Sequence, residues 1–221
     1  MKIIDLTHNI ENGMQIYPGD PEIRISEGLI HESDYCHVDV LQLNSHTGTH
    51  IDAPYHFLPE GKKITDFAAD KFTGKGIALD LRGKGENEAI TVDDIEKALE
   101  KSGGKADAGL SENCIVVLAT GWCEYFGTDK YLRHPYISRE AAEYLVEKGV
   151  SIVAVDFLNV DSTIDEEWNA HPVLLGNDTL IVENLNNTGE LDFGKEYTFS
   201  FQPLKITGSD GSPIRAIAIE E

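Results

Sequence analysis

An eleven-residue stretch holds three of the eight histidines of this 221-residue chain, with an aspartate between the second and the third. It reads His46-Thr-Gly-Thr-His50-Ile-Asp52-Ala-Pro-Tyr-His56. Imidazoles and carboxylates this dense need a counter-charge when they are buried. Nitrogen and oxygen donors without a thiolate suit a zinc or manganese ion that keeps a water ligand. The stretch therefore predicts a metal site, and the fold must bring its four donors together.

The spacing of these donors restricts the local backbone. Their offsets of 0, 4, 6 and 10 are all even, so an extended segment would point them to one face. A straight strand, however, would separate His46 from His50 by about 13 Å, whereas ligands lie about 2.0–2.2 Å from one ion. Gly48, its β-branched neighbours and Pro54 disfavour a regular helix. We expect a tight turn at Gly48, followed by an irregular, proline-stiffened loop.

Length and charge narrow the class of protein. The chain has no linker-like segment, so we expect one domain over residues 1–221. It has no signal-like start and no apolar run of about 18 residues, which predicts a cytoplasmic protein without a membrane partner. A net charge of −21 repels phosphate backbones, so nucleic acid is not an expected partner. Cys36, Cys114 and Cys123 have no metal-ligand spacing and fit free thiols.

Hydrophobic periodicity predicts an α/β fold with a mixed, highly curved β core and two outer helices. Thr91, with Asp94 three residues on, predicts a capped helix that runs to about Ser102 and stops at Gly103-Gly104. Ser138 begins a second helix, which ends before Gly149. Turns are expected at residues 17–21 and 208–211. Strands are expected at 2–6, 22–31, 36–45, 77–81, 114–119, 150–155, 180–183, 197–206 and 214–219.

The four donors need partners from elsewhere in the chain. Glu183 lies in an apolar strand segment, where a carboxylate is costly to bury unless a cation pairs with it. His171 lies upstream, and we take both as candidate ligands, with a solvent-facing strand position as the alternative for Glu183. Asp156 and Asp161 end a buried strand, where active-site residues often lie, but we expect turn or salt-bridge roles for them.

The 46–56 stretch with its following phenylalanine resembles the signature of the cyclase-like metal-dependent hydrolase family, of the bacterial kynurenine formamidase and isatin hydrolase type. The resemblance runs almost end to end. It includes the segments 17–21, 120–122, 138–142 and 210–216, together with His171 and Glu183. It implies a swivelling β/β/α domain, a homodimer or homotetramer, and one or two divalent ions, Zn²⁺ or Mn²⁺.

Position by position, the resemblance implies that His46, His50 and Asp52 bind one metal. Asp52 would bridge to a second metal held by His171 and Glu183. His56 would then be the catalytic acid/base, although a ligand or orienting role remains the alternative for this residue.

These features predict a metal-dependent amidohydrolase with a small-molecule substrate. A divalent cation lowers the pKa of bound water from about 15.7 to about 7, and the resulting metal-bound hydroxide can attack an amide. His56 can protonate the leaving nitrogen. An aryl formamide such as N-formylkynurenine is one candidate substrate. A small cyclic amide is the other, because residues 157–161 and Gln15 depart from the formamidase pattern.

Four aromatic residues are candidate walls for an aromatic substrate: Trp122, Tyr125, Phe126 and Trp168. Two other functions stay open. A lyase or dehydratase would use the metal to acidify a C–H bond, and a non-enzymatic metal-binding protein would fill every coordination position with protein donors.

Overall fold

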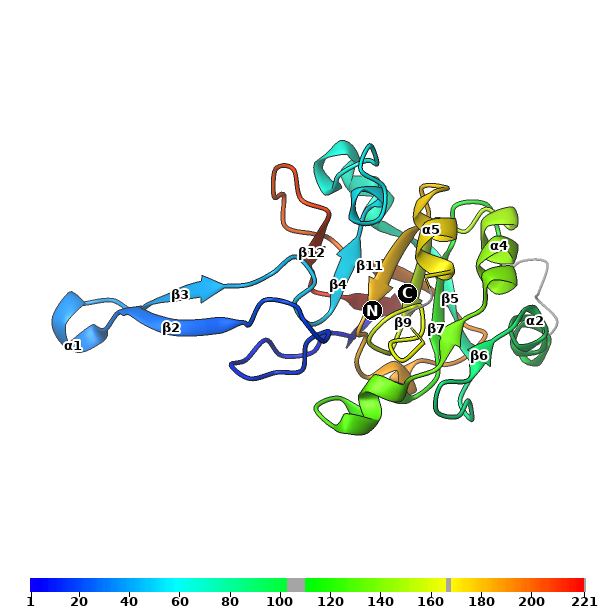
Figure 1. Cartoon of the computed structure of the whole chain (residues 1–221), viewed down its shortest axis with the longest axis horizontal. Helices are drawn as coiled ribbons and strands as arrows, with labels where there is room; N and C mark the ends of the chain where they lie inside the picture. The colour runs from blue at the N-terminus through cyan, green and yellow to red at the C-terminus, as the bar shows by residue number, and fades with distance from the viewer. Residues whose placement is uncertain (103–109, 166–167, 221) are drawn as a thin grey trace.

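A mixed sheet of nine strands organises the computed structural model, which describes residues 1–102, 110–165 and 168–220. In the described chain the strand order is β1-β13-β11-β5-β7-β9-β10-β4-β12. The sheet curls, as Figure 1 shows, and helices lie on one side of it. This architecture confirms the predicted α/β fold with a curved, mixed β core and outer helices.

The centre of the sheet consists of four parallel strands, β5 (Thr73–Asp80), β7 (Ile115–Ala119), β9 (Ile152–Val155) and β10 (Leu180–Glu183). Every residue of β7, β9 and β10 is buried. Continuous apolar runs are typical of strands that are covered on both faces. Hydrophobic residues alternate between two cores: Val116 and Leu118 face one, while Ile115 and Val117 face the other.

Helices α2 (Val92–Lys101), α4 (Arg139–Glu147) and α5 (Ala170–Leu175) contribute apolar side chains to the first of these cores. The predicted capping box of α2 is confirmed, because the Thr91 and Asp94 side chains each accept a hydrogen bond from the other residue's backbone N–H. The Ser138 hydroxyl caps α4 as expected. Helix α5 was not predicted. The expected stop at residues 103–104 lies outside the described residues.

Antiparallel strands close the second core. These strands are β1 (Lys2–Asp5), β13 (Ile217–Glu220) and β11 (Glu196–Ser200) at one side, with β4 (His50–Asp52) and β12 (Gly211–Pro213) at the other. The predicted strands 197–206 and 214–219 have wrong bounds. Pro203 and Pro213 have no N–H to donate to a continuous ladder, so β11 and β12 end before or at them.

A two-stranded hairpin projects from the body of the molecule (Figure 1). Strands β2 (Arg24–Leu29) and β3 (Val38–Gln42) pair only with each other, and α1 (His31–Asp34) joins them. We call residues 24–42 the arm. Strands were predicted in both places, but they are shorter than expected and lie outside the sheet.

The remaining strands and the 3₁₀ turns are short. Strands β6 (Ala89–Ile90) and β8 (Tyr136–Ile137) form a small parallel pair. The 3₁₀ turns are η1 (Pro54–His56), η2 (Ile64–Asp66), η3 (Ala69–Phe72), η4 (Trp122–Tyr125), η5 (Asp129–Arg133) and η6 (Thr188–Glu190). All three cysteines are free thiols, as expected. Among the described helices, none has the length and apolar character that a membrane span requires.

Candidate metal centre

The histidine-rich stretch begins with a turn and continues as a strand. Gly48 has a φ of +60°, which confirms the predicted tight turn. The expectation of an irregular loop beyond it is wrong for His50–Asp52, which form β4. This strand lies between β10 and β12, and backbone hydrogen bonds from both neighbours favour the extended conformation. The turn at Gly48, rather than an irregular loop, brings His46 back beside Asp52.

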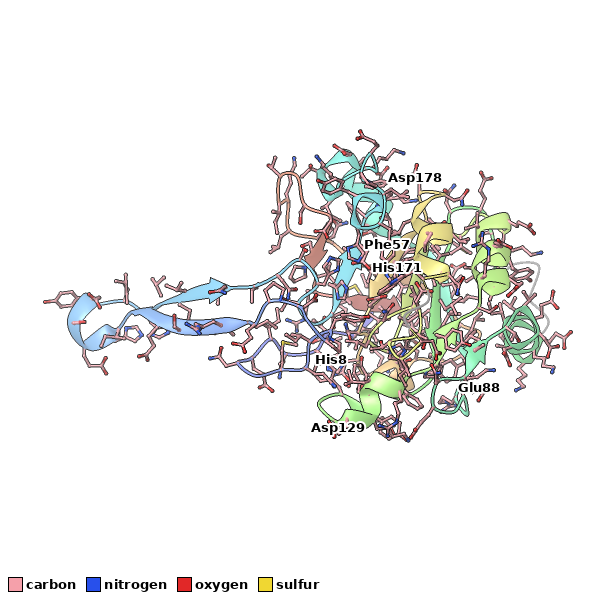
Figure 2. The ribbon with its side chains drawn as sticks, viewed as in Figure 1. His8, Phe57, Glu88, Asp129, His171 and Asp178 are labelled. Carbon is pink, nitrogen blue, oxygen red and sulfur yellow. The ribbon has the colours of Figure 1, made fainter. Side chains whose placement is uncertain are left out.

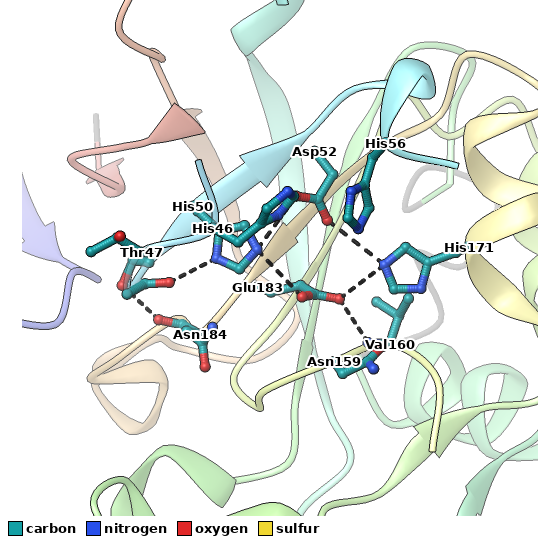
Figure 3. Close-up of polar contacts among 12 residues, drawn as sticks. His46, Thr47, His50, Asp52, His56, Asn159, Val160, His171, Glu183 and Asn184 are labelled. Atoms are coloured by element: carbon teal, nitrogen blue, oxygen red, sulfur yellow. Dashed lines mark hydrogen bonds and ion pairs between the residues drawn. The ribbon is translucent and has the colours of Figure 1, made fainter. Parts of the chain in front are cut away.

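Three buried groups converge where β4 meets β10. Glu183 is the register partner of His50. The His50 Nε2 atom lies 3.4 Å from Asp52 Oδ1 and 3.4 Å from Glu183 Oε2. Two ligands that each lie about 2.1 Å from one ion at a tetrahedral angle are about 3.4 Å apart. The spacing therefore matches a shared cation (Figure 3).

The hydrogen bonds of this cluster support the same conclusion. His50 Nδ1 lies 2.7 Å from the Gly48 carbonyl oxygen, which can only accept, so Nδ1 carries the proton. When Nε2 carries no proton, its lone pair faces two carboxylates. Within the described chain, neither Asp52 oxygen accepts a hydrogen bond, and His50 Nε2 has no hydrogen-bond partner. Buried acceptors that face each other are unfavourable unless a cation lies between them, so the residues fit a divalent metal.

His171, at the start of α5, faces the other oxygens of the same carboxylates. Its Nε2 atom lies 3.5 Å from Glu183 Oε1 and 3.8 Å from Asp52 Oδ2. Its Nδ1 atom donates to Asp161 Oδ2 at 2.7 Å, and three backbone N–H groups of residues 169–171 also bind the Asp161 carboxylate. Asp161 thus forms the predicted salt bridge and also orients a candidate ligand. Asp156 instead accepts hydrogen bonds from Thr120 and Thr188.

His46 and His56 form a second, half-buried cluster with Asp52. His46 Nδ1 lies 2.8 Å from Asp52 Oδ1. Asp210 joins the two imidazoles, because its Oδ2 atom lies 2.9 Å from His46 Nε2 and 3.1 Å from His56 Nδ1. No role was predicted for Asp210. Its position in the Gly-Ser-Asp-Gly turn, within a segment that carries the family resemblance, is the only sequence signal for it.

The charges of the cluster are strongly coupled. Burial alone lowers the pKa of the His46 imidazole, but the Asp52 and Asp210 carboxylates outweigh it and raise the pKa to about 11. Burial likewise opposes protonation of His171, while Asp161, Asp52 and Glu183 raise its pKa to about 10. Burial favours protonation of the Asp52 carboxyl, but His50 and His46 hold its pKa well below the usual range. Ionised carboxylates thus demand positive charge here, which a divalent cation supplies.

A cavity of about 380 Å³ opens onto these groups. Trp168 lines it, as predicted, but Trp122, Tyr125 and Phe126 do not. Phe126 stacks on His8 instead. Tyr17 and Phe57 are aromatic lining residues that were not predicted, although Phe57 directly follows His56. The lining residues are Gln15, Ile16, Tyr17, Asp20, His46, Gly48, His50, His56, Phe57, Leu158, Asn159, Trp168, His171, Glu183 and Asn184.

Aromatic rings form a continuous wall along one side of the cavity, beside the candidate metal ligands. Phe57 stacks on His171 with ring centroids 4.5 Å apart, and Figure 2 shows the two residues side by side. Trp168 lies 5.3 Å from Phe57, and Tyr17 lies 6.2 Å from Trp168. The cavity therefore has an apolar, aromatic side that reaches the candidate ligands.

This chain is thus an α/β protein in which a curved mixed sheet carries a cluster of candidate metal ligands, histidines and carboxylates, beside a cavity with an aromatic side. Residues 4–162 match the family model described as "Putative cyclase", and the chain belongs to this Cyclase family. This membership confirms the family resemblance noted from the sequence.

Relatives and solved structures agree with this membership. A kynurenine formamidase from Bacillus cereus is 30% identical over 225 residues, covering 97% of this chain and 95% of the relative. Isatin hydrolase A from Labrenzia aggregata, bound to benzyl benzoate, shares the fold with a TM-score of 0.86, at 23% identity, covering 100% of this chain and 94% of that one. A potential metal-dependent hydrolase with cyclase activity has a TM-score of 0.79 at 26% identity, covering 98% and 96%.

Proposed function

We propose that this chain is a hydrolase of C–N bonds other than peptide bonds, specifically a metal-dependent amidohydrolase that opens an aryl formamide or a small cyclic amide. Its near-full-length relatives are named kynurenine formamidases, and a formamidase cleaves such a bond. The observation that carries the proposal is the position of the His50 Nε2 atom between the Asp52 and Glu183 carboxylates, 3.4 Å from an oxygen of each.

Five side chains would hold the metal: His46, His50, Asp52, His171 and Glu183. Asp52 and Glu183 each turn one oxygen toward His50 and the other toward His171, which suits one or two ions. A bound divalent cation of the Zn²⁺ or Mn²⁺ type would acidify water and polarise the scissile carbonyl.

His56 would move the protons of the reaction. Asp210 is held ionised by His46 and His56, which keep the pKa of its carboxyl well below the usual range. A carboxylate only accepts, so His56 Nδ1 carries the proton of their 3.1 Å contact. This leaves His56 Nε2 as the basic atom in a side chain that lines the cavity. It can take a proton from the attacking water and pass it to the leaving nitrogen.

The wall of Tyr17, Phe57 and Trp168 supports an aromatic substrate, because aromatic rings that line a cavity pack favourably against another ring. The decisive experiment loads the protein with zinc or manganese and assays formanilides and small lactams in ¹⁸O-labelled water. We expect one ¹⁸O atom in the carboxylate product. Turnover without the label would indicate a lyase, and bound metal without turnover would indicate a binding protein.

Two substitutions separate the role of His56 from those of the ligands. We expect His56→Ala to retain metal and to lose at least about 10²-fold in kcat, since general acid–base groups contribute about 10²–10⁴-fold. Asp52→Ala should lose both metal and activity. Metal analysis and steady-state kinetics measure the two effects, with His31→Ala on the arm as the matched control. Loss of metal from the His56 variant would make His56 a ligand instead.

A further inference from the structure

Two buried asparagines line the cavity with hydrogen-bond donors that the protein does not use. Asn159 and Asn184 are each 3% exposed. Their side-chain oxygens are occupied, because Asn159 Oδ1 accepts from the Asp161 N–H at 2.9 Å and Asn184 Oδ1 accepts from the Tyr131 hydroxyl at 2.8 Å. Burial raises the pKa of Tyr131 well above its ordinary value, so this hydroxyl remains a donor.

These bonds determine which way each carboxamide faces. With the oxygens bonded, the Nδ2 groups are directed elsewhere, and neither donates to any residue that the structure describes. A substrate that displaces water from such a donor without offering an acceptor loses about 1–3 kcal/mol. Both residues border the cavity, so an acceptor that enters the cavity would satisfy these donors.

Both asparagines adjoin the metal centre. Asn184 follows Glu183 directly and has a positive φ of 57°. Its N–H donates to the Phe157 carbonyl oxygen, and its carbonyl oxygen accepts from the Thr49 hydroxyl. Asn159 precedes Val160, whose N–H donates to Glu183 Oε1 at 2.8 Å (Figure 3). The two asparagines therefore line the same cavity as Glu183, next to it and next to its hydrogen-bond partner in the chain.

The charge of the cavity lining indicates which kind of hydrogen-bond acceptor would bind to the two asparagines. Asp20 and Glu183 line the cavity, and its described lining contains no lysine or arginine. The lining histidines would serve the metal and the proton transfer, so a second carboxylate would meet acidic groups without a lysine or arginine to pair with. A neutral carbonyl oxygen needs only the N–H donors.

We propose that Asn159 and Asn184 bind a neutral carbonyl oxygen adjacent to the scissile amide and thereby determine substrate specificity. The proposal rests on the proposed amidohydrolase function. Sites built to bond a polar group of the substrate discriminate strongly against analogues that lack it, because their own groups are left unpaired.

A matched pair of substrates tests the proposal: formanilide, and 2′-formamidoacetophenone, which adds a ketone beside the formamide. We expect the metal-loaded protein to prefer the ketone by at least about tenfold in kcat/KM. Asn159→Asp and Asn184→Asp retain the accepting oxygens and remove the donors. In these variants the ratio of kcat/KM for the ketone substrate to kcat/KM for formanilide should fall toward one. Asn184→Gly, which tolerates the positive φ, is the uncharged variant if an added carboxylate alters metal content. Asn9→Asp on the surface is the control.

Binding of the amine products gives a readout that does not depend on turnover. We expect 2′-aminoacetophenone to bind at least about tenfold more tightly than aniline, with its infrared carbonyl stretch moved to lower frequency, and both effects to disappear in the aspartate variants. If neither formanilide is hydrolysed, the proposed function fails, while ketone-dependent binding still supports the asparagine assignment. If the wild type and the variants prefer the ketone substrate to the same extent, the asparagine assignment is overturned, while the proposed amidohydrolase function still stands.

Discussion

At the scale of single residues, the surroundings of each histidine decide its chemistry. His50 and His171 each use one ring nitrogen to fix their orientation and turn the other toward carboxylates. His134 is buried, and its hydrogen bonds to residues that the structure describes involve no carboxylate. Its Nδ1 atom contacts the Pro135 carbonyl oxygen, and its Nε2 atom contacts the Thr163 hydroxyl, both at 2.7 Å. Burial lowers the pKa of His134 to about 4, so this side chain is neutral in the folded protein.

His134 should make stability depend on pH. Its pKa rises from about 4 in the folded chain to the ordinary 6.5 on unfolding, so the unfolded chain binds the extra proton between these values. Its contribution is complete above pH 6.5 and falls as the pH drops toward 4. We expect the free energy of unfolding to fall between pH 7 and 5 by about 2 kcal/mol more in the wild type than in His134→Gln. Parallel urea titrations measure this, and identical pH slopes would contradict it.

At the scale of elements, the close approach of β12 to β4 positions two candidate ligands. Gly211, at the start of β12, is the register partner of Asp52. A Cβ at this position would lie 2.8 Å from the Ile51 carbonyl oxygen, 3.2 Å from His46 Cε1 and 3.4 Å from Asp52 Oδ1. A contact of 2.8 Å with backbone forces one of the two strands to move.

We therefore expect Gly211→Ala to weaken metal binding by at least about tenfold, the scale seen when groups that orient ligands are lost. Isothermal titration with Zn²⁺ or Mn²⁺ measures the change. Gly74→Ala in β5 is the matched control, because its Cβ would meet only ordinary contacts at 3.6 Å or more. Equal metal affinities in the two variants would show that β12 does not position the ligands.

At the scale of the whole molecule, the arm projects from the body and leaves apolar side chains exposed. Val38, Val40 and Leu29 share one face of it and are exposed. An isolated two-stranded hairpin is marginally stable in water, so such a face favours a covering partner. The segments that join the arm to the body, residues 15–20 and 46–48, also line the cavity. We propose a second copy of this chain as the partner, in line with the homodimer or homotetramer expected from the family resemblance.

Removing the arm tests this assembly. Residues 25–41 can be replaced by an Asn-Gly turn, because Arg24 and Gln42 are paired neighbours. We expect the shortened chain to have the mass of one chain by light scattering, while the full chain has the mass of two or four. The pair Val38→Ser and Val40→Ser keeps the hairpin and should weaken the assembly in the same direction. A full-length chain that is monomeric would rule the proposal out.

Features that depend on neighbouring residues could be predicted from the sequence. The buried strands, the caps of α2 and α4, the turn at Gly48 and the grouping of His46, His50 and Asp52 follow from local patterns, and the structure contains all of them. Their physics acts over a few residues, through propensity, capping bonds and the alternation of side chains.

Contacts between groups that are far apart in the sequence could be read only from the folded structure. The pairing of β4 with β10 brings Glu183 opposite His50, and the paired β12 holds Asp210 near His46 and His56. Phe57 and the two asparagines became cavity residues in the same way, while Trp122 is buried elsewhere and Phe126 stacks on His8. Such contacts arise when packing and strand pairing offset chain entropy over more than a hundred residues, and a local pattern does not encode that balance.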